Sequence, residues 1–247
     1  NYYFYGKHFF SVLLFPLNHI TLKKNKLIIL VKIFCLYLFI FFHFSSNGQD
    51  LTTYFEKSQY KRTPRYDSTV IYCKTLEKAS PNIKLTTIGK SHEGREIVML
   101  IAASNQEFTP EKAKTSNKNI VLIQAGIHAG EPDGKDAGFL LFKDLIQKET
   151  IKKLLNDNII LFIPILNVDG HERFGPFNRI NQNGPEEMGW RCNAQNLNLN
   201  RDYLKAQSAE IKAWLDLFYT WKPDFFIDCH VTDGADYQYP ITYALEI

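Results

Sequence analysis

The sequence predicts an α/β domain that begins near residue 50 and is built on a largely parallel sheet covered on both faces. Three short apolar runs carry this prediction, namely Ile120–Ala125, Asn158–Leu166 and Phe225–Asp228. Strands that are apolar at consecutive positions are typical of sheets buried on both faces. The stretches between these runs have the apolar spacing of helices, and such alternation favours parallel strands between two helical layers.

The first part of this domain is predicted to form a helix followed by a hairpin. Tyr66–Ala79 has its apolar residues at helical spacing, and the Ser-Pro-Asn sequence at residues 80–82 ends the pattern. Lys84–Gly89 and Arg95–Ala103 have the composition of strands, and residues 90–94 supply the turn between them.

Two further helices and a long loop are expected after the first buried strand. Gly134–Thr150 and Ser208–Trp221 have apolar residues along one helical face. Asn167–Gly170 is predicted to form a turn after the second buried strand. Pro176–Leu199 is polar and rich in Gly and Asn, which indicates a functional surface loop rather than a core element.

The composition is that of an ordinary globular protein. The chain has 247 residues, of which 45% are hydrophobic and 22% charged, so it can bury a sizeable core. The net charge of +3 gives no reason to expect a nucleic-acid partner. Cys73, Cys192 and Cys229 follow the N-terminal region, and an odd number of cysteines does not indicate a disulfide framework.

Residues 1–49 differ in kind from the rest. A basic cluster at residues 23–26 precedes the apolar segment Leu27–Phe44, and Ser45–Gln49 is small and polar. This order predicts a secretory signal peptide that is cleaved near Gly48, and hence a secreted or periplasmic protein. The alternative is an uncleaved membrane tether through residues 27–44, because a bilayer needs roughly 18–20 apolar residues. Residues 1–22 are interpreted as an upstream extension.

A His and a Glu three residues apart follow the first buried strand directly, as His128 and Glu131. His230 follows the third apolar run, Phe225–Asp228. Ligand sites in parallel sheets lie beyond the carboxyl ends of the strands, so these three side chains are expected to meet. Catalytic zinc usually takes three protein ligands of these types plus a water. The pattern therefore predicts one zinc ion; a surface turn and two structural histidines are the alternative.

Other polar residues near these motifs receive weaker interpretations. Asp228 either orients a ligand imidazole or is a plain charge at the sheet edge. Cys229 adjoins His230 but faces the opposite side of the strand, which favours a buried core thiol. His92 and His171 have no ligand-like partner at a useful spacing, so both are expected to be loop residues.

Six stretches, taken together, resemble the zinc carboxypeptidase family, the carboxypeptidase A-like metallopeptidases. They occur in the family's order between Asp50 and about Tyr243. They comprise the hairpin turn Gly89–Arg95, the ligand pair in Gly126–Glu131, the strand and turn Pro164–Gly170 (with Val168 where the family has Pro), the pair Trp190–Arg191, the segment Leu197–Asp202, and His230.

The resemblance implies a mixed, mostly parallel sheet with helices on both faces, and zinc-dependent removal of a residue from the C-terminus of a peptide or protein. It also implies roles for single residues. Arg191 would hold the scissile carbonyl oxygen, and Asn200 and Arg201 would bind the substrate's free carboxylate, which suits a guanidinium fork. Arg173 and Arg179 lie in the same segment, and either could supply the cation at the scissile carbonyl oxygen in place of Arg191.

The sequence departs from the family pattern in three places. Gly130 stands where members often carry Arg, so one substrate-binding cation is expected to be missing. Val231–Gly234 replaces the Ser-Tyr that often follows the third ligand. The family's catalytic glutamate is expected beyond Ile247, because Glu246 is too close to His230. Residues 50–247 would then be the N-terminal part of a catalytic domain with an incomplete sheet.

These departures leave other functions open. A zinc amidase, a deacylase or a hydrolase of peptidoglycan peptides would keep the metal and change the bond that is cleaved. A non-catalytic binding module on the same scaffold is the third possibility. Asp233 and Asp236 either form a turn or contact a substrate amine.

Overall fold

The computed structural model describes residues 32–34, 49–232, 234–235, 238–239 and 241–245. The chain divides into two units, Asn1–Gln49 and Asp50–Ile247. The predicted signal peptide, Asp233 and Asp236, and Glu246 lie outside the described residues, apart from a helical stretch at 32–34. Among the described residues, no helix combines the length and the apolar character needed to cross a bilayer.

The second unit contains a five-stranded sheet in the order β1-β2-β4-β3-β5. Its strands are β1 (Ile83–Lys90), β2 (Glu96–Ala102), β3 (Asn119–Gln124), β4 (Asn158–Ile163) and β5 (Phe225–Asp228). β1 pairs with β2, and β2 with β4, in antiparallel fashion, whereas β3 is parallel to both β4 and β5. β2 therefore runs opposite to the other four, and the prediction of a mixed, mostly parallel sheet is confirmed.

The helices connect the strands and cover the sheet. The elements are α2 (Tyr54–Lys57), α3 (Tyr66–Ala79), α4 (Pro110–Thr115), α5 (Asp133–Gln147), α6 (Glu149–Lys152), α7 (Val168–Glu172), α8 (Ala209–Trp221) and the 3₁₀ turns η1 (Lys153–Asn156) and η2 (Leu199–Arg201). The predicted helix over Gly134–Thr150 is therefore two helices, α5 and α6. The side chains of Thr53, Thr109, Asn167 and Ser208 accept main-chain N–H groups at the starts of α2, α4, α7 and α8.

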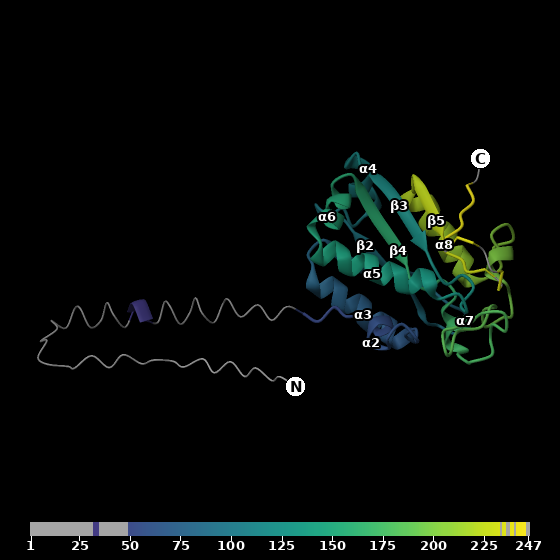
Figure 1. The fold of residues 1–247 in the computed structure, drawn as a ribbon. Coiled ribbons are helices and arrows are strands. Elements are labelled where there is room, and N and C mark those ends of the chain that lie inside the picture. The colour runs from purple at the N-terminus through teal and green to yellow at the C-terminus, as the bar shows by residue number, and fades with distance from the viewer. Residues whose placement is uncertain (1–31, 35–48, 233, 236–237, 240, 246–247) are drawn as a thin grey trace, which may run out of the picture. The chain divides into compact units, whose positions relative to one another are not determined.

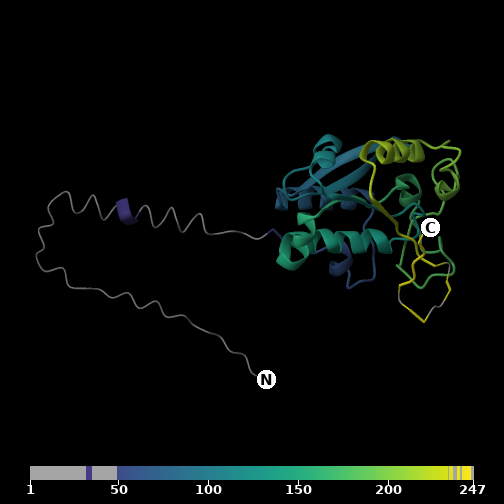
Figure 2. The same ribbon diagram turned by 90° about the horizontal axis from the view of Figure 1, so that it is seen from above.

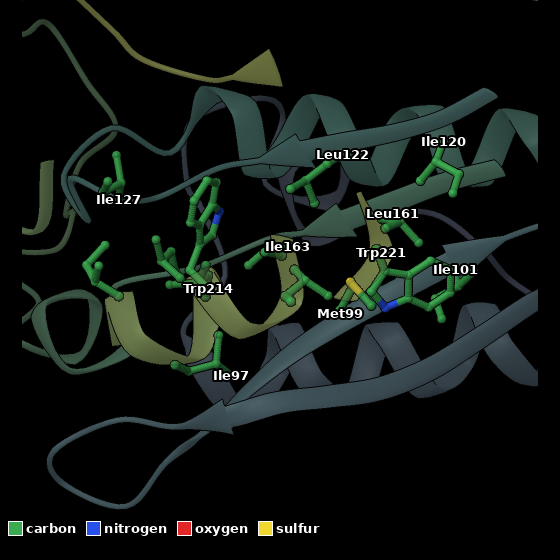
Figure 3. Close-up of a cluster of buried hydrophobic side chains, with 14 of the residues drawn as sticks. Ile97, Met99, Ile101, Ile120, Leu122, Ile127, Leu161, Ile163, Trp214 and Trp221 are labelled. Carbon is green, nitrogen blue, oxygen red and sulfur yellow. The ribbon is translucent and has the colours of Figure 1, made fainter. Parts of the chain in front are cut away.

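Helices cover both faces of the sheet (Figures 1 and 2). Side chains that alternate along the strands form two cores, one on each face. On β2, Met99 and Ile101 point to the face covered by α8, whereas Val98 and Leu100 point to the face covered by α3 and α5. Trp214 and Trp221 of α8 lie among these aliphatic side chains (Figure 3). On the other face the core includes Cys73 and Leu76 of α3 and Phe139 and Phe142 of α5.

Two predictions about local structure are corrected. The predicted turn Asn167–Gly170 is the start of α7, because the Asn167 side chain accepts the N–H of Gly170 at 2.9 Å and caps a helix. β5 was expected to be buried on both faces, yet Phe225 is 53% exposed. This strand is the last in the sheet order and pairs with β3 alone among the described strands, so fewer neighbours cover it.

Candidate metal centre

The segment that carries His128 and Glu131 leaves the sheet at Gly126, directly after β3. Gly126 has φ of +64°, and a Cβ atom there would lie 3.3 Å from Cα of Ile165. Glycine is suited to both conditions because it lacks a side chain and tolerates positive φ. Main-chain hydrogen bonds from Leu166 to Ala125 and from Asn167 to Gly126, both 3.0 Å, hold this exit against the chain that follows β4.

The structure brings His128, Glu131 and His230 into one cluster. Nδ1 of His128 lies 3.0 Å from Oε1 of Glu131, and Nδ1 of His230 lies 3.0 Å from its Oε2. One potential ligand atom from each of the three residues lies within 4.8 Å of the others. His128 and Glu131 are buried, whereas the His230 side chain is 35% exposed. The cluster is thus open to solvent on the His230 side.

A second layer of polar groups faces the remaining ring nitrogens. Oδ1 of Asn198 lies 3.2 Å from Nε2 of His128, and Oδ2 of Asp228 lies 2.9 Å from Nε2 of His230. A metal-binding histidine usually donates its other ring N–H to such an oxygen. Both contacts leave the two Nδ1 atoms to face the shared centre. The sequence analysis gave Asp228 as either a contact of an imidazole or a plain charge at the sheet edge, and the structure shows the contact with the His230 ring.

Hydrogen bonds in the cluster perturb two pKa values. Burial raises the pKa of Glu131, but hydrogen bonds with His128, His230 and the Val231 amide outweigh it and hold the pKa well below its usual range. Hydrogen bonds to Asp228, and secondarily to Glu131, raise the pKa of His230 to about 9. Glu131 is therefore an anion at neutral pH, as a metal-binding carboxylate must be.

Two arginines from the long loop reach the same carboxylate oxygen. Nη1 of Arg179 lies 2.8 Å from Oε1 of Glu131, and Nη1 of Arg191 lies 3.6 Å from the same oxygen. Arg173 instead donates to the Asn196 side chain and to the carbonyl of Ala194, both at 2.9 Å. Of the three predicted candidates for the cation, two lie at the cluster and Arg173 does not.

The predicted carboxylate-binding pair lies beside His230. Nδ2 of Asn200 is 3.4 Å from Nε2 of His230. Arg201 is exposed, and its Nη1 donates to the main-chain oxygen of Asn200 at 2.9 Å. The neighbouring Asp202 accepts hydrogen bonds from Gln207 and Ser208.

Several residues that support the site received no role in the sequence analysis. The Asn167 side chain donates to the carbonyls of Arg191, at 3.1 Å, and Ile127, at 3.4 Å, so it ties the two site segments together. Asp169 accepts from Ser91 Oγ and from Arg95, both at 2.7 Å, and thereby holds the hairpin turn. Their presence in the motif Asn167–Gly170 was the available signal.

The expectation that His171 is a loop residue is wrong. His171 lies on α7 with 2% of its surface exposed, and its Nε2 accepts from Nζ of the buried Lys135 at 2.9 Å. Lys135 also donates to the carbonyl of Pro64 at 2.7 Å. No local pattern indicates this contact, because Lys135 and His171 lie far apart in the chain. His92 lies in the exposed turn, as expected.

Cys229 was expected to be a buried core thiol. In the structure it is partly buried and packs on the core that lies between the sheet and helices α3 and α5, where a Cβ atom at Gly134 would lie 2.3 Å from its Cβ. Among the described residues, Cys73, Cys192 and Cys229 are free cysteines.

The sequence profile of the zinc carboxypeptidase family matches residues 69–244, most of the chain and all of the cluster. The chain belongs to the zinc carboxypeptidase family. Among curated relatives in the family, carboxypeptidase Z of Rattus norvegicus is 30% identical over 138 residues, which is 53% of this chain and 20% of that protein. Probable carboxypeptidase 2 of Trichophyton verrucosum (strain HKI 0517) is 30% identical over 143 residues, covering 57% and 24% of the two chains.

Solved carboxypeptidases have the same fold. Carboxypeptidase A from Helicoverpa armigera superposes with a TM-score of 0.57 at 20% identity, over 85% of this chain and 53% of that one. A metallo-carboxypeptidase from Burkholderia cenocepacia gives 0.55 at 22% identity, over 70% and 42%. The chain therefore spans about half or less of the length of these two structures and about a fifth to a quarter of the curated relatives named above.

The donor set fits a zinc ion. Two imidazole nitrogens and a carboxylate converge from two strand ends, and the ring nitrogens that face away from the centre contact Asn198 and Asp228. Catalytic zinc sites use this combination of ligands and leave one position open. The partial exposure of His230 gives a small molecule access to the cluster.

Proposed function

We propose that the full-length protein is a zinc-dependent carboxypeptidase that binds one zinc ion through His128, Glu131 and His230. The observation that supports this most is the convergence of the three ligand atoms within 4.8 Å at the carboxyl ends of β3 and β5. Family membership supports the same assignment. The substrate would be the C-terminus of a peptide or protein.

When bound, zinc polarises a carbonyl group and makes water a stronger acid, with a pKa that can reach about 7. The chain's own residues prepare this chemistry. Asn198 and Asp228 fix the two imidazole rings so that each Nδ1 faces the centre. Arg191 is proposed to donate to the scissile carbonyl oxygen as negative charge develops there, an interaction often worth about 3 kcal/mol in barrier height.

The group that accepts the proton from water is expected to be a glutamate. The family resemblance matches none of the described residues of this chain to that glutamate. That carboxylate would pass the proton on to the departing amine, which restores its starting charge.

Recognition of the substrate is proposed to rest on Asn200 and Arg201. Nδ2 of Asn200 lies 3.4 Å from Nε2 of His230, and the next residue, Arg201, is exposed. A guanidinium can make two parallel charged hydrogen bonds to a carboxylate, which would select a free C-terminus over an internal peptide bond.

The test compares one peptide with a free C-terminus and the same peptide with an amidated C-terminus. The proposal expects release of the last residue from the free peptide, with kcat/KM at least about 10²-fold lower for the amide because a charged contact is lost. Arg201→Gln should reduce this preference, whereas Lys205→Gln, an equally conservative change at an exposed neighbour, should keep it.

Equal turnover of the two peptides would favour the amidase, deacylase or peptidoglycan-peptide hydrolase. The departure at Val231–Gly234 is the observation that keeps this alternative in view. A protein that binds zinc but turns over neither peptide would instead favour the binding module.

We propose that residues 27–44 direct export of the protein and are removed near Gly48. The apolar segment after a basic cluster supports this proposal. N-terminal sequencing of the mature protein from a native extract tests it. A start near Gln49 in the soluble fraction agrees, and retention of residues 27–44 in the membrane fraction would favour the tether.

A further inference from the structure

Two of the departures from the family pattern, Gly130 and the segment at Gly234, contact the same piece of the long loop. A Cβ atom at Gly130 would lie 2.7 Å from Cγ and 3.0 Å from Cδ of Arg179, and 2.7 Å from the carbonyl oxygen of Gly189. The aliphatic stem of Arg179 therefore occupies the space that a side chain at residue 130 would need. Residue 130 must be glycine for this arginine to lie where it does.

The other end of this loop piece fits against Gly234. A Cβ atom at Gly234 would lie 2.4 Å from the carbonyl oxygen of Asn181, and Gly234 has φ of +86°, which favours glycine. Nε2 of Gln182 donates to the carbonyl of Thr232 at 3.3 Å. Residues 179–182, here called the wedge, are thus held between Gly130, directly before Glu131, and the chain after His230.

The wedge brings the Arg179 guanidinium to the metal cluster. The Arg179 side chain is 7% exposed, and its Nη1 donates to Oε1 of Glu131 at 2.8 Å. Arg191 approaches the same oxygen at 3.6 Å, with 34% of its side chain exposed. Two guanidinium groups therefore flank the cluster. The more buried one belongs to Arg179, which the sequence analysis considered as an alternative to Arg191.

The position of the Arg179 guanidinium suits the stabilisation of negative charge. Its side chain is 7% exposed, and its stem packs against Gly130. A fixed cation that is largely shielded from water stabilises developing negative charge strongly and needs no rearrangement during the reaction.

We propose that Arg179 is a second cation for the negative charge that develops on the scissile carbonyl oxygen, delivered by the wedge between Gly130 and Gly234. This inference rests on the proposed function. The sequence analysis expected one substrate-binding cation to be missing at residue 130. Under this inference Arg179, which lies 49 positions further along the chain, supplies a cation in its place. Both glycines then serve the same purpose, which is to leave room for the wedge.

The first test measures binding and does not depend on turnover. A phosphinic peptide with a free C-terminal carboxylate imitates the charged tetrahedral state, and its Kd is measured by calorimetry on the zinc-loaded full-length protein. Arg179→Gln should weaken this binding on the order of 10²-fold, while binding of the parent peptide changes little. Arg179→Lys keeps a cation and should fall between wild type and Arg179→Gln.

Zinc content and melting temperature are recorded for every variant. The proposal expects zinc content to stay at the wild-type level in Arg179→Gln. Arg173→Gln is the matched control, because Arg173 belongs to the same loop but bonds to Asn196 and Ala194 away from the cluster. This variant should bind the phosphinic peptide as wild type does.

The second variant moves the wedge without changing Arg179. Gly234→Ala places a methyl group against the carbonyl of Asn181, so it should also weaken the phosphinic peptide more than the parent peptide. This variant keeps the proposal testable if Arg179→Gln does not fold.

Three results would overturn the inference. One is wild-type affinity for the phosphinic peptide in Arg179→Gln, and another is an equal loss in the Lys and Gln variants. The third is a loss that follows zinc content alone, because Arg179 would then serve only to hold Glu131. If wild-type protein binds the phosphinic peptide but releases no residue from any peptide, the proposed function fails while the role of Arg179 in binding the anion stands.

Discussion

Asp228 holds the ring of His230, with Oδ2 of the carboxylate 2.9 Å from Nε2 of the imidazole. The two residues lie at the end of β5, and Gln124 of β3 donates to the other carboxylate oxygen at 2.7 Å. The sheet thus fixes the carboxylate, and the carboxylate fixes the ring. A rigid chain of contacts from strand to ligand is what a metal centre needs to keep its geometry.

Asp228→Asn is expected to weaken zinc binding by about 10- to 100-fold, because the charged acceptor of the His230 N–H is lost while the size of the side chain is kept. Titration against a chelator of known affinity measures the change. Asp216→Asn, the same substitution at an exposed position of α8, is the control. An unchanged zinc affinity in Asp228→Asn would mean that the contact with His230 has no part in holding the metal.

The buried His171 is expected to make the protein less stable in acid. Burial, together with the charge of Lys135, lowers the pKa of His171 to about 3. An unfolded histidine has a pKa of about 6.5, so between these values the unfolded chain binds more protons. The free energy of unfolding should therefore fall as the pH falls from about 6.5 towards 3, by at most about 1.4 kcal/mol per pH unit from this group.

His171→Gln removes this contribution. Urea unfolding at pH of about 7 and about 5, with a chelator present in all samples, should show a smaller loss of stability in acid for the variant than for wild type. His92→Gln changes an exposed histidine and should keep the wild-type difference. The interpretation of His171 as a buried neutral ring is wrong if His171→Gln loses as much stability between the two pH values as wild type and His92→Gln do.

Gly138 of α5 lies against the ring of Phe162 in β4. A Cβ atom at Gly138 would lie 2.1 Å from Cζ of Phe162, a side chain with no exposed surface. Gly138→Ala should thus destabilise the domain by about 1–3 kcal/mol or more, because the ring has no room to move. Thermal unfolding measures this.

Gly175→Ala is the matched control for that substitution. The nearest atoms to a Cβ there belong to the Asn178 side chain at 3.6 Å, an ordinary contact distance. This variant should melt close to wild type. Similar melting temperatures for Gly138→Ala and wild type would show that α5 and β4 are not packed as described.

The features that could be predicted from the sequence are those that repeat locally. The apolar run of β4 and the helical spacing of Tyr66–Ala79 each depend on neighbouring residues, and the structure has both elements. His128 and Glu131 follow the β3 run directly, and His230 follows the β5 run. The rule that ligand sites lie beyond the carboxyl ends of parallel strands then predicted that these three side chains meet. The convergence of these three residues needed no knowledge of the loops.

The remaining features depend on contacts between distant residues. α7 is five residues long, too short to show a period, and is started by the Asn167 side chain. Lys135 meets His171 only because α5 and α7 lie together in the fold. Arg179 lies in a long loop without regular structure, and it reaches Gly130 in a fold where the nearby Asn181 packs against Gly234. Local patterns carry no information about such contacts.

Zinc stoichiometry of the full-length protein, determined by elemental analysis after purification without added metal and with competition by a chelator, tests the central claim most directly. The account predicts one zinc ion per chain in wild type and a loss of zinc in both His128→Ala and His230→Ala, with zinc retained in His92→Ala. A folded wild-type protein that takes up no zinc, or two histidine variants that bind it as tightly as wild type, would contradict the account.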